Sequence, residues 1–129
     1  MTYIFIGIGG IVGSLLRYLM FSISVSLWGE GFPIGTLLTN LIGALLLGVF
    51  TVKFSQKGRM NPQIKIAIST GAIGSFTTLS TLSSDAVLLL NSGSYFFAFL
   101  YVFFSLIGGL AAIYLGFKMV ELRDREEAK

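Results

Sequence analysis

The chain has 129 residues, of which 54% are hydrophobic and only 12% are charged. Soluble domains carry charge on about 25% of their residues, so this composition, with a mean hydropathy of +0.86, predicts a membrane protein. The absence of histidine and cysteine excludes disulfides, thiolate chemistry and imidazole chemistry. The net charge of +3 comes mostly from basic residues between or after apolar stretches, so we expect no nucleic-acid partner.

Four apolar stretches are long enough to cross a bilayer, because about 20 helical residues span its hydrocarbon core. These predicted spans cover about residues 3–27, 34–54, 62–90 and 95–120. Glycine and proline mark the first turn, and Pro62 is suited to the first turn of the third span. The sequence therefore predicts an all-α integral membrane protein of the cell membrane, with one four-helix domain over residues 1–129.

The basic residues lie on one side of the predicted bundle. Four spans place the N-terminus, the middle loop and the C-terminal tail on the same side, which receives eight lysines and arginines, while the other side receives none. By the positive-inside rule, this split predicts that both termini are cytoplasmic. Contact with anionic lipids is an alternative role for these charges. The eight residues are Lys53, Lys57, Arg59, Lys65, Lys118, Arg123, Arg125 and Lys129.

The third span is unusually polar, with nine hydroxyl side chains between Ser69 and Ser84. An interruption near Gly74 and Ser75 would free backbone groups, and ion binding is one recurrent use of such groups in membranes. The alternative is close helix packing, with hydroxyls bonded to carbonyls one turn earlier. On a continuous helix four hydroxyl residues would share one face. They are Thr77, Ser80, Thr81 and Ser84.

Polar residues also occur in the other spans. Asn40 in the second span needs a hydrogen-bond partner, either in a neighbouring helix or in a pore. Arg17 in the first span could snorkel, pair with carbonyls or attract anions. In the fourth span Tyr101 and Ser105 are four residues apart and so share a helix face.

Three segments together resemble the Fluc fluoride channels, also called CrcB proteins. They are GGIVGSLLRY at 9–18, GTLLTNLIG at 35–43 and GAIGSFTTLSTL at 71–82. The resemblance implies a broken third helix, an antiparallel dimer, two fluoride pores along the subunit interface and one structural sodium ion at the centre. It also implies a passive channel that exports cytoplasmic fluoride and thereby reduces its toxicity, which is not an enzyme.

The resemblance assigns roles to particular residues. Backbone carbonyls of Gly74 and Thr77 are expected to hold the sodium ion, and carbonyl oxygens suit such a hard cation. Pore-lining groups are expected to supply N–H and O–H donors that replace the water around fluoride. They are Asn40, Ser80, Thr81, Tyr101 and Ser105.

The sequence departs from the family pattern at two positions. Leu79 and Leu82 stand where the family has phenylalanines whose electropositive ring edges face fluoride, and leucine has no such edge. Together with the one-sided basic residues, this favours a heterodimer with a homologous subunit of opposite orientation over a homodimer. The alternative is a non-conducting scaffold subunit. A small multidrug exporter is less consistent with the sequence, because the first span carries Arg17 and no carboxylate.

Overall fold

A computed structural model describes residues 1–56 and 60–127. The described part of the chain is almost entirely helical and contains no strand, which confirms the predicted all-α fold. The first span is α1 and the fourth is α6, while the second consists of α2 and the π-helix η1. The third is divided into α3, the π-helix η2, α4 and α5. Their bounds are Thr2–Trp28 for α1, Ile34–Phe50 for α2, Thr51–Gln56 for η1, Pro62–Ile66 for α3, Ala67–Ile73 for η2, Gly74–Phe76 for α4, Leu79–Asn91 for α5 and Tyr95–Glu127 for α6.

Four helical stretches have the length and apolar character needed to cross a membrane, so the chain is a multi-pass membrane protein. They run over Thr2–Trp28, Ile34–Phe54, Pro62–Asn91 and Tyr95–Glu126. The last of them extends beyond the predicted end near residue 120, because α6 continues through most of the charged tail. Lys57, Arg59 and Lys129, which contribute to the predicted charge asymmetry, lie outside the described residues.

Local sequence signals set the helix ends. Gly29 after α1 and Gly93 after α5 both have a φ of 76°, a left-handed conformation that glycine adopts without steric cost. Asn61 caps α3 by accepting a hydrogen bond from the Gln63 amide at 2.9 Å, and Pro62 occupies the first helical position. The turn glycines and the helix-starting proline therefore act as the sequence predicts.

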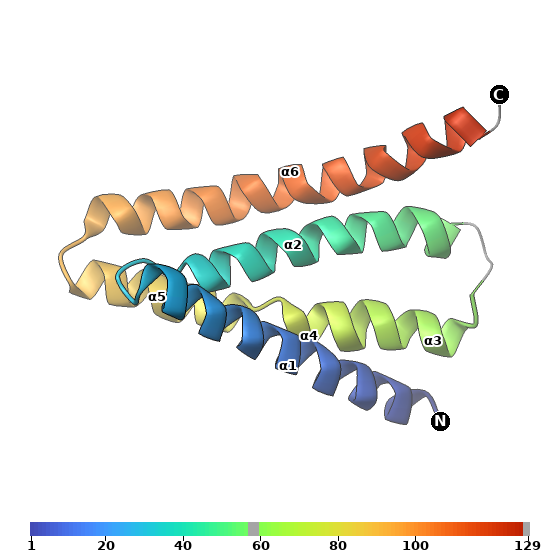
Figure 1. The fold of residues 1–129 in the computed structure, drawn as a ribbon, viewed down its shortest axis with the longest axis horizontal. Helices are drawn as coiled ribbons and strands as arrows, with labels where there is room; N and C mark the ends of the chain where they lie inside the picture. Colours follow the sequence, from blue (N-terminus) through green and yellow to red (C-terminus); the bar gives the residue numbers. More distant parts are fainter. Residues whose placement is uncertain (57–59, 128–129) are drawn as a thin grey trace.

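The four spans form two closely packed pairs (Figure 1). In one pair α1 lies against the third span, because Gly9 and Gly13 bring it against the carbonyls of Ala67 and Ala72 in η2. In the other pair α2 contacts α6, where Gly48 meets the backbone of α6. Small residues at membrane helix interfaces allow this close approach of backbones.

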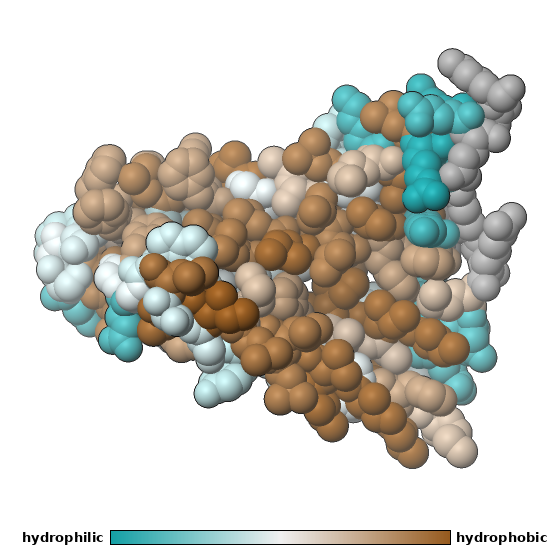
Figure 2. All heavy atoms as spheres, viewed as in Figure 1, coloured by the Kyte–Doolittle hydropathy of each residue, from teal (hydrophilic) through white to brown (hydrophobic). Residues whose placement is uncertain are grey.

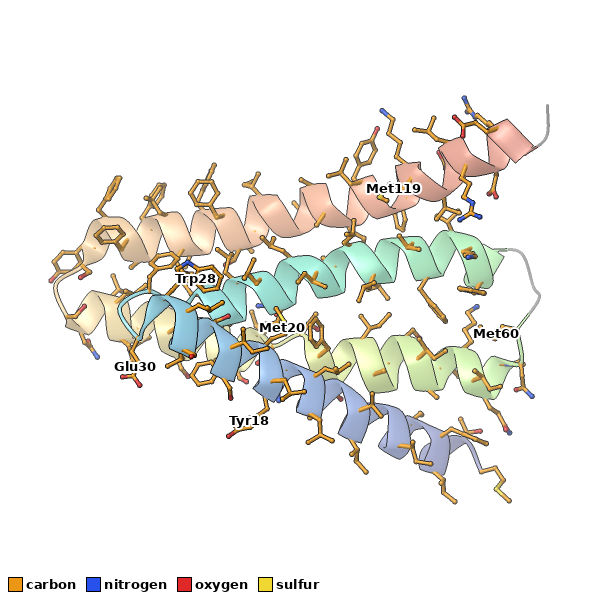
Figure 3. All side chains as sticks on the ribbon, viewed as in Figure 1. Tyr18, Met20, Trp28, Glu30, Met60 and Met119 are labelled. Carbon is orange, nitrogen blue, oxygen red and sulfur yellow. The ribbon has the colours of Figure 1, made fainter. Side chains whose placement is uncertain are left out.

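Both chain ends lie at the same end of the bundle (Figure 1), and Glu30 lies at the opposite end from Met60 (Figure 3). Figure 2 shows apolar side chains over most of the visible surface, with hydrophilic atoms at both ends and the larger group at the end that carries the C-terminal part of α6. Tyr101 and Thr39 are the largest fully buried side chains, whereas many apolar residues of α1 and α6 are exposed. The structure is therefore suited to lipid contact on its outside and polar contacts inside.

Candidate functional site

The third span is broken between Phe76 and Leu79, which confirms the predicted interruption. Thr77 and Thr78 have extended backbones, with ψ values of 158° and 123°. Gly74 is helical, with φ −63° and ψ −34°, so the break lies three residues after the predicted glycine. The predicted face shared by four hydroxyl residues is not formed as stated, because Thr77 is in the break and outside the helix that carries the other three.

The Asn40 side chain holds the break from the second span. Its Nδ2 donates to the Thr78 carbonyl at 3.0 Å, and the Thr78 amide donates to its Oδ1 at 2.8 Å. In an unbroken helix the Thr78 amide would donate to the Gly74 carbonyl. Asn40 therefore replaces one helical hydrogen bond and satisfies the exposed backbone of the break. Of the two roles considered for Asn40, the interhelical hydrogen bond is observed.

Thr78 starts the second half of the span. Its Oγ1 accepts a hydrogen bond from the Thr81 amide at 3.2 Å, as an N-cap residue does. The same hydroxyl donates to Thr81 Oγ1 at 3.1 Å and lies 3.2 Å from Ser80 Oγ. Sequence reasoning assigned no role to Thr78. The preference for threonine at helix N-caps was the signal that could have identified it.

Two carbonyls at the break lack their usual helical donors. The amides of Thr78 and Thr81, which would bond Gly74 and Thr77 in a continuous helix, instead bond to side chains. In the described part of the chain no backbone amide donates to either oxygen, and Gly74 O receives only the Thr77 hydroxyl at 3.4 Å. Open carbonyl oxygens are chemically suited to a hard cation such as sodium. Residues 1–56 and 60–127 contain no acidic cluster that could hold a metal.

A first hollow of about 410 Å³ lies between α2, the break and α6. It brings together six residues that the sequence singled out. They are Asn40, Gly74, Thr77, Leu79, Leu82 and Ser105. A single hollow thus combines one amide, open carbonyls and the two leucines at the positions where the resemblance leads us to expect phenylalanine.

A second hollow of about 310 Å³ lies beside α1 and α2. Its lining includes Arg17, Thr36, Thr39 and Thr81, so it combines a cation with hydroxyl groups. Thr78 borders both hollows. Among the described residues none makes a hydrogen bond or ion pair with Arg17, so the suggested pairing with carbonyls is not seen there.

Tyr101 and Ser105 use their hydroxyl protons within the subunit. Tyr101 is fully buried and donates to Asp85 Oδ2 at 3.1 Å, while its ring packs edge-on against Phe32 at 5.7 Å. Ser105 donates to the Tyr101 carbonyl at 2.7 Å. Tyr101 lines neither of the two hollows, whereas Ser105 lines the first. Their pore-lining role remains a prediction.

The two leucines have different surroundings. Leu79 is 75% exposed at the start of α5, whereas Leu82 packs against the buried cluster that contains Tyr101. Ser80 is also exposed beside the break. A larger side chain at position 79 would therefore project out of the subunit, and one at position 82 would press on its core.

These features define a class: four-span membrane proteins in which side chains hold a polar break in the third span. A family profile described as "CrcB-like protein, Camphor Resistance (CrcB)" matches residues 4–117. The chain belongs to this family. The resemblance noted from the three sequence segments is thereby confirmed.

Named relatives cover nearly the whole chain. The chain is 39% identical over 126 residues to "Fluoride-specific ion channel FluC 2" of Geobacillus kaustophilus, covering 98% of each protein. It is 41% identical to "FluC 1" of Bacillus cereus strain ATCC 10987, covering 92% of this chain and 87% of the relative. It is 38% identical to "FluC" of Shewanella woodyi, covering 91% and 94%. The relatives are named as ion channels, and the expectation that this family member is not an enzyme is confirmed.

Proposed function

We propose that this chain is a subunit of a fluoride-selective passive channel that lets cytoplasmic fluoride leave the cell. The observation that carries the proposal is the break in the third span, where amide and hydroxyl groups border two hollows. The residues that line these hollows include no carboxylate. The fluoride specificity stated in the names of its relatives supports the same function.

The chemistry of the break suits a small, strongly hydrated anion, which needs hydrogen-bond donors in place of its water. Asn40 has two N–H groups, and Thr78 accepts from its side-chain nitrogen, so a second N–H is left to donate. Arg17 in the second hollow adds a positive potential that attracts anions. The sequence carries no nucleotide-binding motif, so we expect transport without direct ATP drive.

We propose an antiparallel dimer whose second subunit is a homologous protein of opposite orientation. The eight-to-none distribution of loop lysines and arginines supports a fixed orientation with cytoplasmic termini. The carbonyls of Gly74 and Thr77 would hold a structural sodium ion, which would offset the negative ends of these dipoles. The donors diverted to Asn40 and Thr78 leave these two oxygens open, and that supports the assignment.

Fluoride efflux from liposomes tests the function. The complete assembly is reconstituted in vesicles loaded with fluoride, and release is followed with a fluoride-selective electrode. We expect fluoride to leave rapidly down its gradient while chloride is retained. Absence of fluoride release, or equal release of chloride, would contradict the proposal.

A non-conducting scaffold role is the second candidate. The observation that favours it is Leu79, exposed at a position where fluoride-binding members of the resembled family have phenylalanine. The test is to reconstitute the pair and substitute Asn40 in this chain only. Unchanged flux would favour the scaffold role, whereas a decrease larger than the loss of assembled, folded protein explains would support a conducting subunit.

The orientation is tested separately. The chain has no cysteine, so Glu30→Cys and Glu121→Cys each introduce a single labelling site. An impermeant thiol reagent applied outside intact cells is expected to label position 30 and leave position 121 unlabelled. Labelling of both positions in similar amounts, with strong flux from this chain alone, would instead indicate a homodimer of dual orientation.

A further inference from the structure

Two backbone amides at the break are diverted from their helical acceptors to side chains. The Thr78 amide donates to Asn40 Oδ1 at 2.8 Å, and the Thr81 amide donates to Thr78 Oγ1 at 3.2 Å. The Thr78 carbonyl is also bonded, because it accepts from Asn40 Nδ2 at 3.0 Å. The Asn40 and Thr78 side chains, which we call the clamp, thus satisfy the backbone groups that a break would leave without partners.

The clamp decides which carbonyls stay open. Without these side chains, the arrangement of lowest free energy is a continuous helix, in which the two amides donate to the carbonyls of Gly74 and Thr77. Both amides then bond to these carbonyls, because a backbone amide without an acceptor inside a membrane costs several kcal/mol. The clamp therefore keeps the third span broken and both oxygens available.

The clamp also sets the direction of a hydroxyl donor. Thr78 Oγ1 has one proton, which it donates to Thr81 Oγ1, and two lone pairs, which can accept from the Thr81 amide and Ser80 Oγ. Its hydrogen-bonding capacity is then used completely. Because Thr81 Oγ1 accepts from Thr78, its own proton is left to donate, and Thr81 lines the hollow that contains Arg17.

We propose that Asn40 and Thr78 are the positioning residues of the pore, which hold the third span broken so that the Gly74 and Thr77 carbonyls stay open and the Thr81 hydroxyl donates into the hollow. Thr78 acts without needing to touch fluoride. The flux and sodium measurements rest on the proposed channel function, whereas the exchange measurement below does not.

The experiment compares Thr78→Val, which keeps the side-chain shape and removes the hydroxyl, with Thr78→Ser, which keeps the hydroxyl. Thr51→Val is the matched control, because the Thr51 hydroxyl only bonds back to the Leu47 carbonyl at 2.7 Å, away from the break. Each variant is studied as the purified assembly in detergent and in liposomes. Asn40→Ala is added to test the other half of the clamp.

Residue-resolved NMR tests the clamp itself through backbone chemical shifts and hydrogen exchange. We expect Thr78→Val and Asn40→Ala to move the backbone carbon shifts at positions 77 and 78 from extended towards helical values, because the freed amides return to the Gly74 and Thr77 carbonyls. Wherever the backbone stays extended, the freed amide should exchange about five-fold faster or more. Thr78→Ser and Thr51→Val should keep the extended shifts and the protection of both amides. Extended shifts together with unchanged protection in the two disruptive variants would overturn the proposal.

Sodium dependence and flux test the consequence. We expect Thr78→Val to raise the sodium concentration that half-maximally increases the thermal unfolding temperature by about ten-fold, and to lower fluoride flux per assembled unit. Thr78→Ser should restore both. Equal defects in the valine and serine variants would contradict a role for the hydroxyl. If the valine variant does not assemble, the serine variant must still behave as wild type, and a defect there also overturns the proposal.

If the wild-type assembly releases no fluoride, the proposed function fails, and the exchange rates still decide whether the clamp exists. If the wild-type assembly conducts fluoride and Thr78→Val changes neither the flux nor the NMR results, the positioning role is wrong while the proposed channel function stands.

Discussion

The third span and α6 are both long enough to cross a membrane, but only the third span is broken. In α6 the Ser105 hydroxyl bonds back to the carbonyl of Tyr101, four residues earlier, and the helix continues. In the third span the Thr78 hydroxyl bonds forward to the Thr81 amide and begins a new helix. At these two positions, the direction in which the hydroxyl bonds therefore distinguishes a continuing helix from the start of a new one.

The same contrast exists within the third span. Ser69, Ser83 and Ser84 each bond back to a carbonyl four residues earlier, as hydroxyls do in ordinary membrane helices. The high density of hydroxyls thus marked the correct span, but several of these groups bond only to their own helix. The mutual bonds among Thr78, Ser80 and Thr81 are confined to the few residues that follow the break.

Removing the clamp should produce the largest effect. Asn40→Leu eliminates two partly buried hydrogen bonds, and we expect the free energy of unfolding to fall by about 2–4 kcal/mol and fluoride flux to be largely lost. The pore-lining role expected for Asn40 accounts for the lower flux, and the clamp adds the loss of stability. Thermal unfolding and electrode-recorded efflux measure the two effects.

The control for this substitution is Asn91→Leu at the exposed end of α5, which should leave flux unchanged. Full stability in the Asn40→Leu protein would show that the two hydrogen bonds of Asn40 contribute little to the fold.

The next largest effect is expected from substituting a glycine in a tightly packed contact, in comparison with a glycine that has open space around it. A Cβ at Gly13 would meet the Ala72 carbonyl, so Gly13→Ala should destabilise the subunit by about 1–3 kcal/mol. A Cβ at Gly74 has its nearest neighbour, Ser69 O, at 3.6 Å, so Gly74→Ala should leave the subunit folded. A bulky residue at Gly74 is then expected to affect assembly rather than folding. Circular dichroism melts and size-exclusion chromatography separate these outcomes.

Phenylalanine should destabilise the subunit at position 82 and leave its stability nearly unchanged at position 79. Leu82→Phe adds volume against the Tyr101 cluster and should cost about 1–2 kcal/mol, whereas Leu79→Phe should change stability little because position 79 is exposed. Thermal melts of the two variants give the comparison. Equal melting temperatures would mean that the core around Tyr101 accommodates a larger ring.

The smallest effect is expected at the continuous helix. Tyr101→Phe keeps the edge-on contact with Phe32 and removes the hydrogen bond to Asp85, so we expect a loss of about 0.5–1.5 kcal/mol. Tyr114→Phe on the exposed face of α6 is the matched control and should not change the melting temperature. A decrease in flux larger than the loss of stability explains would favour a pore role for the Tyr101 hydroxyl.

Much of the candidate site was predictable because the residues that form it are chemically unusual in a membrane span. Asn40, Arg17 and the polar third span were singled out on that basis, and the structure brings most of the selected residues to two hollows. The break lies at Thr77 and Thr78 rather than at the predicted Gly74. Hydrogen bonds to side chains, and not the flexibility of Gly74, end the helix there. The complete burial of Tyr101 within the subunit follows from packing against Phe32 and α5, which no local pattern reveals, while its pore-lining role stays a prediction.

The sequence by itself determined the four spans, the turns between them and the one-sided basic residues, because span length, turn glycines and loop charge are local properties with direct physical consequences. Only the tertiary structure decided that Asn40 bonds Thr78, a residue 38 positions away, and that the Gly74 and Thr77 carbonyls are left open. The physical reason is that a hydrogen bond between helices depends on their relative depth and rotation. Where α2 meets the third span, they are set by close packing at Gly43, because a Cβ there would overlap the Thr77 side chain.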